Sequence, residues 1–231
     1  MTGKLKALVR HIPGIQSIYI WYSKIRFRGS RPYWESRYAR GGNSGAGSYQ
    51  RLAIFKAEIL NSFVQTHDIQ SIIEFGCGDG NQLSLADYPK YLGIDISSTA
   101  LKLCVDRFHD DPKKTFGLYD DFSDRNENNK QTAELTLSLD VIYHLVEDDI
   151  FEMHMKNLFE FATRFVIVYS SNHGGGATAG HVRHRNFTNW VLENASSWQL
   201  ETKIDNKYPH DPDDPDETSF ADFYVFERKQ T

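Results

Sequence analysis

A short run of glycines constrains the fold of this chain more than any other feature. In the segment SIIEFGCGDGNQLSL, residues 71–85, an apolar run is interrupted by an acid, Glu74, and Gly76, Gly78 and Gly80 follow at alternate positions. Glycine adopts backbone angles closed to other residues and lets a ligand approach the main chain. A buried strand followed by such a turn is typical of an open α/β sheet that binds a ligand beyond its strand ends. A tight turn without a ligand is the alternative.

Strands and helices alternate along the rest of the chain. A helix is expected at 97–108, with Ser97 or Ser98 as its N-cap, and another around 147–162. Seven strands are expected, at 71–75, 91–96, 115–119, 134–142, 164–171, 198–204 and 220–228. This order predicts a doubly wound, mostly parallel seven-stranded sheet with helices on both faces. The last two strands suit an antiparallel hairpin at one edge.

The first 48 residues differ in composition from the rest, and we separate them as an extension to a domain at 49–231. From Leu5 to Phe27, apolar residues recur at steps of three and four, which predicts an amphipathic helix with a break at Pro13. Residues 31–48 read as an aromatic and glycine-rich connector or lid. Ser48 is the expected N-cap of a second amphipathic helix.

Composition bounds the class of protein. The chain has 231 residues, 40% of them hydrophobic, which is typical of a soluble globular protein. Two cysteines and no long apolar run argue against a disulfide framework, a membrane span and export, so we expect a cytoplasmic protein. The net charge of −5 argues mildly against nucleic acid as the main partner.

Charge is unevenly distributed, because residues 1–40 hold nine basic side chains and one acidic side chain. The basic, aromatic segment Leu5–Phe27 has the composition of a helix that lies on a membrane surface. A helix docked on its own domain, or on a second subunit, explains the same pattern. Peripheral membrane contact and a dimer are therefore both open hypotheses.

The motif Glu74-Phe-Gly76-Cys-Gly78-Asp-Gly80 resembles motif I of the class I S-adenosylmethionine-dependent methyltransferases. A nicotinamide-binding motif would instead place its third glycine at position 81, which is Asn. Three further matches follow at the ends of successive predicted strands: Asp95, then Asp121-Phe122, then LSLDVIYHL at 137–145. The resemblance covers residues 70–172 by motif. It implies a Rossmann-like methyltransferase fold with S-adenosylmethionine as cofactor.

The resemblance also implies roles for individual residues. Glu74 orients the loop or the cofactor's amino group, and Asp95 accepts hydrogen bonds from both ribose hydroxyls. Asp121 bonds the adenine amine and Phe122 covers the ring, while Arg37 pairs with the methionine carboxylate. The full set expected at the cofactor is Glu74, Gly76, Cys77, Gly78, Gly80, Asp95, Ile96, Asp121, Phe122, Asp140 and Arg37.

Three of these residues have alternative interpretations. Ile96 lies against the adenine or packs in the core. Asp140 touches the cofactor or a neighbouring amide. Cys77 is a small filler rather than a nucleophile, because no base adjoins it in the sequence.

Methyl transfer from a sulfonium requires alignment, and requires a base only if the acceptor carries a proton. His144, directly after the fourth strand, is the first candidate base, with His181 and His184 as alternatives. A histidine that merely bonds to backbone explains His144 equally simply. The expected acceptor-binding residues are Tyr33, Tyr143, Arg183 and Arg185.

Arg183 and Arg185 stand at the end of a glycine-rich loop, residues 174–187, and guanidinium groups there suit an anionic acceptor such as a phosphate. Pairing with the acidic segment 211–217 is the alternative. No metal is expected, because Glu147, Asp148 and Asp149 suit the first turn of a helix and the histidines lack further ligands nearby.

The segment HVRHR at 181–185 and the aromatic connector resemble small bacterial methyltransferases of surface-glycan and secondary-metabolite pathways. No N/D-P-P-Y/F-type motif follows the fourth strand, which argues against amine methylation of nucleic acid. We therefore expect O-methylation of a sugar, or of a nucleotide-sugar or phospho-sugar. N-methylation of a small molecule, a non-catalytic cofactor-binding regulator and a nicotinamide-dependent oxidoreductase are the alternatives.

Overall fold

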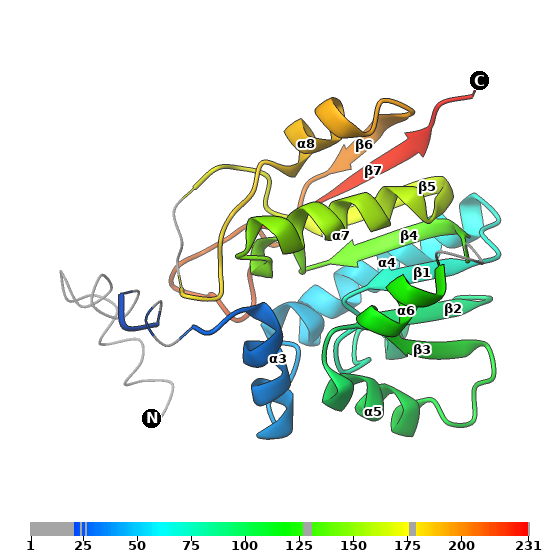
Figure 1. The fold of residues 1–231 in the computed structure, drawn as a ribbon. Coiled ribbons are helices and arrows are strands. Elements are labelled where there is room, and N and C mark those ends of the chain that lie inside the picture. The colour runs from blue at the N-terminus through cyan, green and yellow to red at the C-terminus, as the bar shows by residue number, and fades with distance from the viewer. Residues whose placement is uncertain (1–20, 24, 26, 127–130, 176–178, 231) are drawn as a thin grey trace.

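The computed structural model describes residues 21–23, 25, 27–126, 131–175 and 179–230. A seven-stranded sheet has the order β3-β2-β1-β4-β5-β7-β6 (Figure 1). Its strands are β1 Ile72–Phe75, β2 Tyr91–Asp95, β3 Lys114–Leu118, β4 Ala133–Leu139, β5 Ala162–Ser170, β6 Trp198–Ile204 and β7 Asp222–Arg228. The first five strands pair in parallel, and β7 runs antiparallel to both β5 and β6. The predicted sheet and its closing antiparallel hairpin are confirmed.

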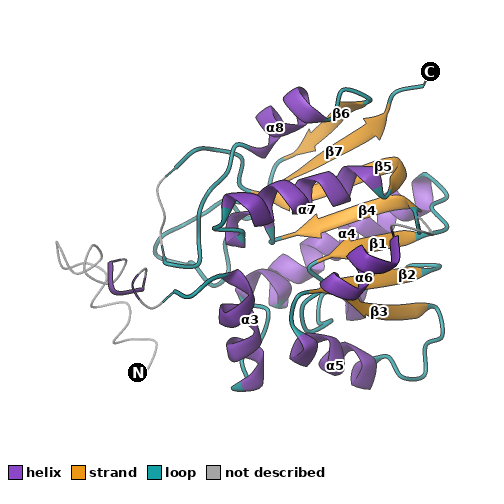
Figure 2. Cartoon of the chain, viewed as in Figure 1, coloured by secondary structure: helices purple, strands orange, loops and turns teal. Residues whose placement is uncertain are grey.

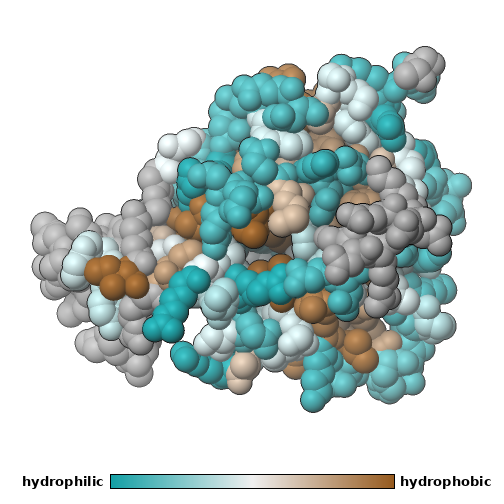
Figure 3. Space-filling view, in the orientation of Figure 1, coloured by the Kyte–Doolittle hydropathy of each residue, from teal (hydrophilic) through white to brown (hydrophobic). Residues whose placement is uncertain are grey.

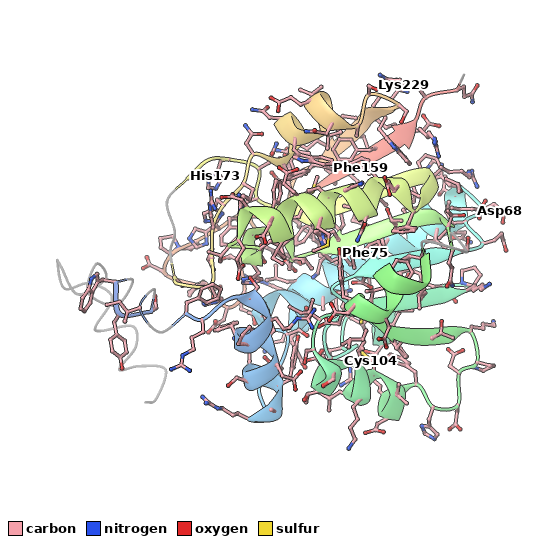
Figure 4. The ribbon with its side chains drawn as sticks, viewed as in Figure 1. Asp68, Phe75, Cys104, Phe159, His173 and Lys229 are labelled. Carbon is pink, nitrogen blue, oxygen red and sulfur yellow. The ribbon has the colours of Figure 1, made fainter. Side chains whose placement is uncertain are left out.

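Helices cover both faces of the sheet (Figure 2). One face carries α4 (Gln50–Thr66) and α5 (Ser98–Arg107), and the other carries α6 (Tyr119–Asn126), α7 (Asp148–Glu160) and α8 (Phe187–Asn194). Successive strand residues point to opposite faces, so each face has its own apolar core. Phe75 shows this on the α7 side, where its ring lies 5.8 Å from that of Phe122 (Figure 4).

Two of the predicted helix caps have different outcomes. Ser97 caps α5, because its Oγ accepts a hydrogen bond from the Ala100 amide at 3.1 Å. Ser48 does not cap α4. It lies in a short 3₁₀ turn, η1 (Ala46–Ser48), and the residue at the N-cap of α4 is Tyr49, without a side-chain cap. A second 3₁₀ turn, η2 (Leu83–Leu85), follows the glycine run.

Residues 31–48 are not an irregular connector throughout, because they contain most of helix α3 (Ser30–Ala39). Pro32 lies in the first turn, where a missing N–H costs no helical hydrogen bond. Gly41, at φ 76°, follows the end of the helix and turns the chain. α3 lies beyond the carboxyl ends of the parallel strands (Figure 1), where open sheets bind their ligands.

The predicted N-terminal helix is described only at its end. Residues 21–23 and 25 are helical, and the rest of residues 5–26 lies outside the described residues. Trp21 and Ile25 are exposed. Within the described parts of the chain, no helix combines the length and apolar character needed to cross a bilayer.

β4 ends at Leu139, earlier than expected. Asp140 has φ 61°, outside the strand region, and a 3₁₀ turn, η3 (Ile142–His144), follows it. The Asp140 amide still donates to the Tyr169 carbonyl at 2.9 Å, so the turn stays attached to β5. The positive φ redirects the chain across the carboxyl end of the sheet, beside the glycine turn.

Candidate active site

A cavity of about 610 Å³ lies at the carboxyl ends of β1, β2 and β4, a volume typical of sites for small molecules. In the space-filling view, apolar residues show at the bottom of a recess between α3, α6 and α7 (Figure 3). Eight of the residues predicted for the site line the cavity: Glu74, Gly76, Cys77, Gly78, Asp95, Ile96, Asp140 and His144. Gly80 completes the turn behind it.

The glycine turn is possible only without side chains. Gly76 and Gly78 have φ of 91° and 58°, in the left-handed region. A Cβ on Gly76 would lie 2.4 Å from Val141 Cγ2, and one on Gly78 would lie 2.3 Å from Ser44 Oγ. Neighbouring segments therefore close on the backbone of the turn, which forms one wall of the cavity.

Asp95 connects the end of β2 to the glycine turn. Its Oδ2 accepts from the Gly78 amide and its Oδ1 from the Ser97 amide, both at 2.9 Å. Burial raises the pKa of Asp95 to about 6, although these hydrogen bonds act in the opposite direction. A carboxylate has about four acceptor positions, so Asp95 can accept a further hydrogen bond from a ligand in the cavity.

Glu74 lies on the α4 side of β1, with its side chain buried. The Tyr91 hydroxyl donates to its Oε2 at 2.6 Å. Burial raises the pKa of Glu74 to about 7, and the Tyr91 hydrogen bond and the nearby Lys56 oppose that shift. The cavity wall thus holds a carboxyl group that titrates near neutral pH.

The sequence did not single out Asp79, which fastens the segment before α4 to the glycine turn. Asp79 Oδ2 accepts from the Ser44 amide at 2.9 Å and from the Tyr49 hydroxyl at 2.8 Å. The Asp79 amide donates back to Ser44 Oγ at 3.0 Å. An aspartate inside a glycine run is the signal that could have indicated this structural role.

Helix α3 forms the roof of the cavity, and hydrogen bonds at three of its residues attach it to neighbouring helices. Ser30 donates from its amide and hydroxyl to Glu147, at 2.8 and 2.6 Å. Arg31 pairs with Asp120. Glu35 accepts from the Ser97 hydroxyl at 2.7 Å, at the N-terminus of α5. Hydrogen bonds between α3 and the starts of α5, α6 and α7 therefore hold the roof in place.

His144 lies in the cavity wall, where its ring is edge-on to that of Trp34 at 4.9 Å. Its Nδ1 lies 2.9 Å from the His181 carbonyl oxygen, which can only accept, so Nδ1 carries the hydrogen and Nε2 the lone pair. Burial lowers the pKa of His144 to about 4. The imidazole is therefore neutral at pH 7. Tyr33 stacks on the His181 ring at 4.4 Å and supports this arrangement.

The fold of this chain is shared with known proteins. No family model matches the chain. The N-methyltransferase NodS from Bradyrhizobium japonicum, solved with S-adenosyl-L-homocysteine, is 14% identical and has a TM-score of 0.66, covering 87% of this chain and 100% of that one. The chain has the fold of the class I S-adenosylmethionine-dependent methyltransferases. The resemblance seen in the motifs is thus confirmed by the structure.

Two other solved methyltransferases have a similar fold. The methyltransferase domain of a bacterial Hen1 protein (CtHen1-C) is 20% identical with a TM-score of 0.58, over 76% of this chain and 97% of that one. Magnesium protoporphyrin IX methyltransferase from Synechocystis, with bound S-adenosylhomocysteine, is 13% identical with a TM-score of 0.61, over 86% and 98%. The predicted cofactor, S-adenosylmethionine, agrees with these neighbours.

One curated protein is similar in sequence. The small RNA 2'-O-methyltransferase of Arabidopsis thaliana is 28% identical over 129 residues, which is 51% of this chain. The match spans only 14% of that protein.

Of the residues expected at the adenine, Ile96 lines the cavity, whereas Asp121 and Phe122 do not. Asp121 is exposed, and Phe122 packs in the core between the rings of Phe75 and Phe161. α6 begins directly after β3, so its helical period turns Phe122 inward. Tyr119 and Asp120, at the start of α6, line the cavity instead.

The expected acceptor-binding arginines also lie away from the cavity lining. Arg183 and Arg185 both pair with Asp148 at the start of α7, and not with residues 211–217. Arg185 donates further to the carbonyls of Leu145 and Val146, each at 2.9 Å. These contacts hold the loop before α7, so the structure does not support a phosphate site there. Residues 176–178 of the preceding loop lie outside the described residues.

Four other predicted residues make contacts within the protein. Arg37 Nε donates to the Asn43 carbonyl at 2.6 Å, and Arg37 is not among the cavity-lining residues. The Tyr143 hydroxyl donates to Asp140 Oδ1 at 2.8 Å. His184, whose Nδ1 lies 2.7 Å from Ser171 Oγ, and Tyr33 are likewise outside the cavity lining. Their assigned roles stay predictions.

Lys56 is a charged cavity residue that sequence reasoning missed. It lies on α4 between Leu52 and Leu60, at the spacing of the buried face, and its side chain is 1% exposed. A lysine at an apolar position of a helix is the signal that could have found it. No three His, Cys, Asp or Glu side chains among the described residues are placed to hold a metal ion.

Proposed function

We propose that the protein transfers a methyl group from S-adenosylmethionine to a hydroxyl group of a small polar acceptor, such as a sugar, a nucleotide-sugar or a phospho-sugar. One observation carries the proposal. A single cavity is bordered by the glycine turn, by the carboxylate of Asp95 and by the neutral imidazole of His144. Cofactor-binding groups and a candidate base therefore share one space.

The residues of the cavity fit the cofactor. Its wall carries the carboxyl groups of Glu74, Asp95 and Asp140, which favour a ligand with cationic groups. The turn at Gly76 and Gly78 admits a ligand close to the backbone. S-adenosylmethionine, when bound, supplies an electrophilic methyl group on a sulfonium. By the resemblance, Asp95 holds the ribose and Glu74 lies at the amino-acid part.

His144 is the residue that we assign as general base. Its Nε2 lone pair accepts the proton of the acceptor hydroxyl, and the His181 carbonyl fixes the ring through Nδ1. The low pKa of His144 keeps the ring unprotonated, at the expense of basicity. The hydroxyl therefore loses its proton as the carbon–oxygen bond forms, rather than before.

The histidine assignment predicts a selective loss of turnover. His144→Asn keeps an N–H donor close to where Nδ1 stands but removes the base at Nε2. We expect kcat to fall by about a hundredfold or more while the S-adenosylmethionine Kd stays unchanged. The measurement is formation of S-adenosylhomocysteine with a panel of sugars, sugar phosphates and nucleotide sugars. His184→Asn tests the alternative base, and wild-type turnover in His144→Asn would remove His144 from the mechanism.

We also propose that the acceptor is anionic, and that Arg28 binds it instead of Arg183 and Arg185. Arg28 lines the cavity and is exposed, and the described residues provide it with no carboxylate partner. A phosphate on the acceptor has a guanidinium available there. Arg28→Ala is expected to raise the KM of a phosphorylated acceptor and to leave that of its dephosphorylated form unchanged.

A ribose hydroxyl of RNA is the second candidate acceptor. It is favoured by the curated small RNA 2'-O-methyltransferase, since the matching 129 residues span half of this chain. A ribose 2'-hydroxyl is itself a sugar hydroxyl, so the same base serves. Turnover with a short RNA and none with free sugars or nucleotide sugars would select this candidate. N-methylation of an amine acceptor, or no turnover at all, would favour the remaining alternatives.

A further inference from the structure

Lys56 and Asp140 form a buried ion pair in the cavity wall. The Lys56 ammonium lies 2.5 Å from Asp140 Oδ2 and 5.3 Å from the centre of the Tyr169 ring. Both residues line the cavity, although their side chains are only 1% and 11% exposed. A lysine normally leaves a helix toward solvent, so its direction here requires an explanation.

The carboxylate of Asp140 is held from several sides. Lys56 donates to Oδ2, and the Tyr143 hydroxyl donates to Oδ1 at 2.8 Å. The backbone of Asp140 has φ 61°, and its amide donates to the Tyr169 carbonyl. A Cβ on Gly47 would lie 2.7 Å from Oδ2, so the segment before α4 also closes over this oxygen. The protein thus fixes one carboxylate against the cavity.

Stability alone does not explain the pair. Removing two charges from water offsets most of their mutual attraction, and apolar residues of similar size are often as stable. The pair also lies near a second carboxyl group, since Glu74 senses the charge of Lys56. The acidic residues Glu74, Asp95 and Asp140 outnumber Lys56 in this part of the wall, which favours a cation.

We propose that Lys56 is a positioning residue, which holds the Asp140 carboxylate so that it receives the ammonium of the cofactor's amino-acid part. This inference rests on the proposed function, because it requires S-adenosylmethionine in the cavity. Lys56 acts through Asp140. Asp140 is the residue that contacts the ligand.

The test compares two ligands that differ only where the inference applies. S-adenosylhomocysteine has the amino-acid part, whereas 5'-methylthioadenosine has the adenosine and the sulfur without it. The double variant Lys56→Met/Asp140→Asn removes both charges together, so neither is left buried alone. We expect its Kd for S-adenosylhomocysteine to rise by about tenfold or more and its Kd for 5'-methylthioadenosine to stay within about twofold.

A control is the partly exposed ion pair of Arg164 and Glu134, at 2.9 Å, near the starts of β5 and β4 and away from the cavity. Arg164→Met/Glu134→Gln is expected to bind both ligands as the wild type does. Unchanged S-adenosylhomocysteine affinity in the Lys56/Asp140 variant would overturn the inference. An equal loss for both ligands would also overturn it, because the pair would then support the pocket as a whole.

The proposed function fails in a different way. If the wild type bound neither ligand, the proposed function would be overturned, and this inference with it. If the wild type bound S-adenosylhomocysteine and the double variant bound it equally well, the roles of Lys56 and Asp140 would both be wrong while the proposed function stood.

Discussion

At the scale of single residues, Glu74 makes the stability of the protein depend on pH. Its carboxyl group is buried, bonded by the Tyr91 hydroxyl, and has its pKa raised to about 7. In the unfolded chain its pKa is near the ordinary 4.5. Folding therefore favours the protonated form, and the stability gained at low pH is lost as pH rises through about 7.

Glu74→Gln is expected to be as stable as the wild type near pH 4.5 and about 3 kcal/mol more stable at pH 8. Desolvation lowers the pKa values of His144, His154, His181 and His184, so these histidines change stability in the opposite direction. The effect of Glu74 is therefore the difference in the free energy of unfolding between Glu74→Gln and the wild type at each pH. Urea unfolding of the ligand-free proteins at several pH values measures it. A constant difference across pH would show that Glu74 is ionised in the folded protein.

Sequence reasoning found the residues that a local motif specifies. Glu74, the glycines and Asp95 follow from strand ends that can be located along the chain, and all except Gly80 line the cavity. Lys56 and Asp120 were missed, because their place in the wall depends on how α4 and α6 pack on the sheet. Phe122 was assigned to the adenine although its helical phase directs it into the core.

At the scale of elements, the start of α7 is organised by Arg185. This side chain is 9% exposed and donates to three carbonyls, those of residues 145–147, besides pairing with Asp148. Arg183 pairs with the same Asp148 but is 44% exposed. Both arginines were predicted to bind the acceptor, but in the structure they differ in burial and in their hydrogen bonds.

Arg185→Ala is expected to lower the free energy of unfolding by about 2 kcal/mol or more, since buried carbonyls lose a charged donor. Arg183→Ala should cost less than about 1 kcal/mol, because water screens its ion pair. Thermal or urea unfolding of both variants measures the difference. If both variants were as stable as the wild type and both had a raised KM for the acceptor, the hypothesis that Arg183 and Arg185 bind a phosphate of the acceptor would be restored.

The roof helix α3 shows what sequence patterns miss at this scale. The hydrogen bonds that hold α3 in place join Ser30 to Glu147, Arg31 to Asp120 and Glu35 to Ser97, and the partners are far apart along the chain. No periodicity within residues 30–39 indicates those partners. The glycines at 41, 42 and 45 suggested a connector, and they follow the helix rather than replace it.

At the scale of the whole molecule, the sheet was predictable because each parallel strand is a short apolar run between turn signals. The parallel pairing, the place of the ligand cavity and the closing antiparallel strands follow from that order. The division at residue 48 stays a prediction, and so do the cytoplasmic location, the membrane contact and the dimer. Most of the segment expected at a membrane lies outside the described residues.

Calorimetric titration of the wild type and of Asp95→Ala is the most direct test of whether this cavity binds S-adenosylmethionine. We expect one site per chain in the wild type and no binding of nicotinamide dinucleotides. We expect about hundredfold weaker binding in Asp95→Ala, from the loss of two hydrogen bonds to a charged acceptor, provided that the variant still unfolds cooperatively. A wild type that bound a nicotinamide dinucleotide and not S-adenosylmethionine would contradict these expectations.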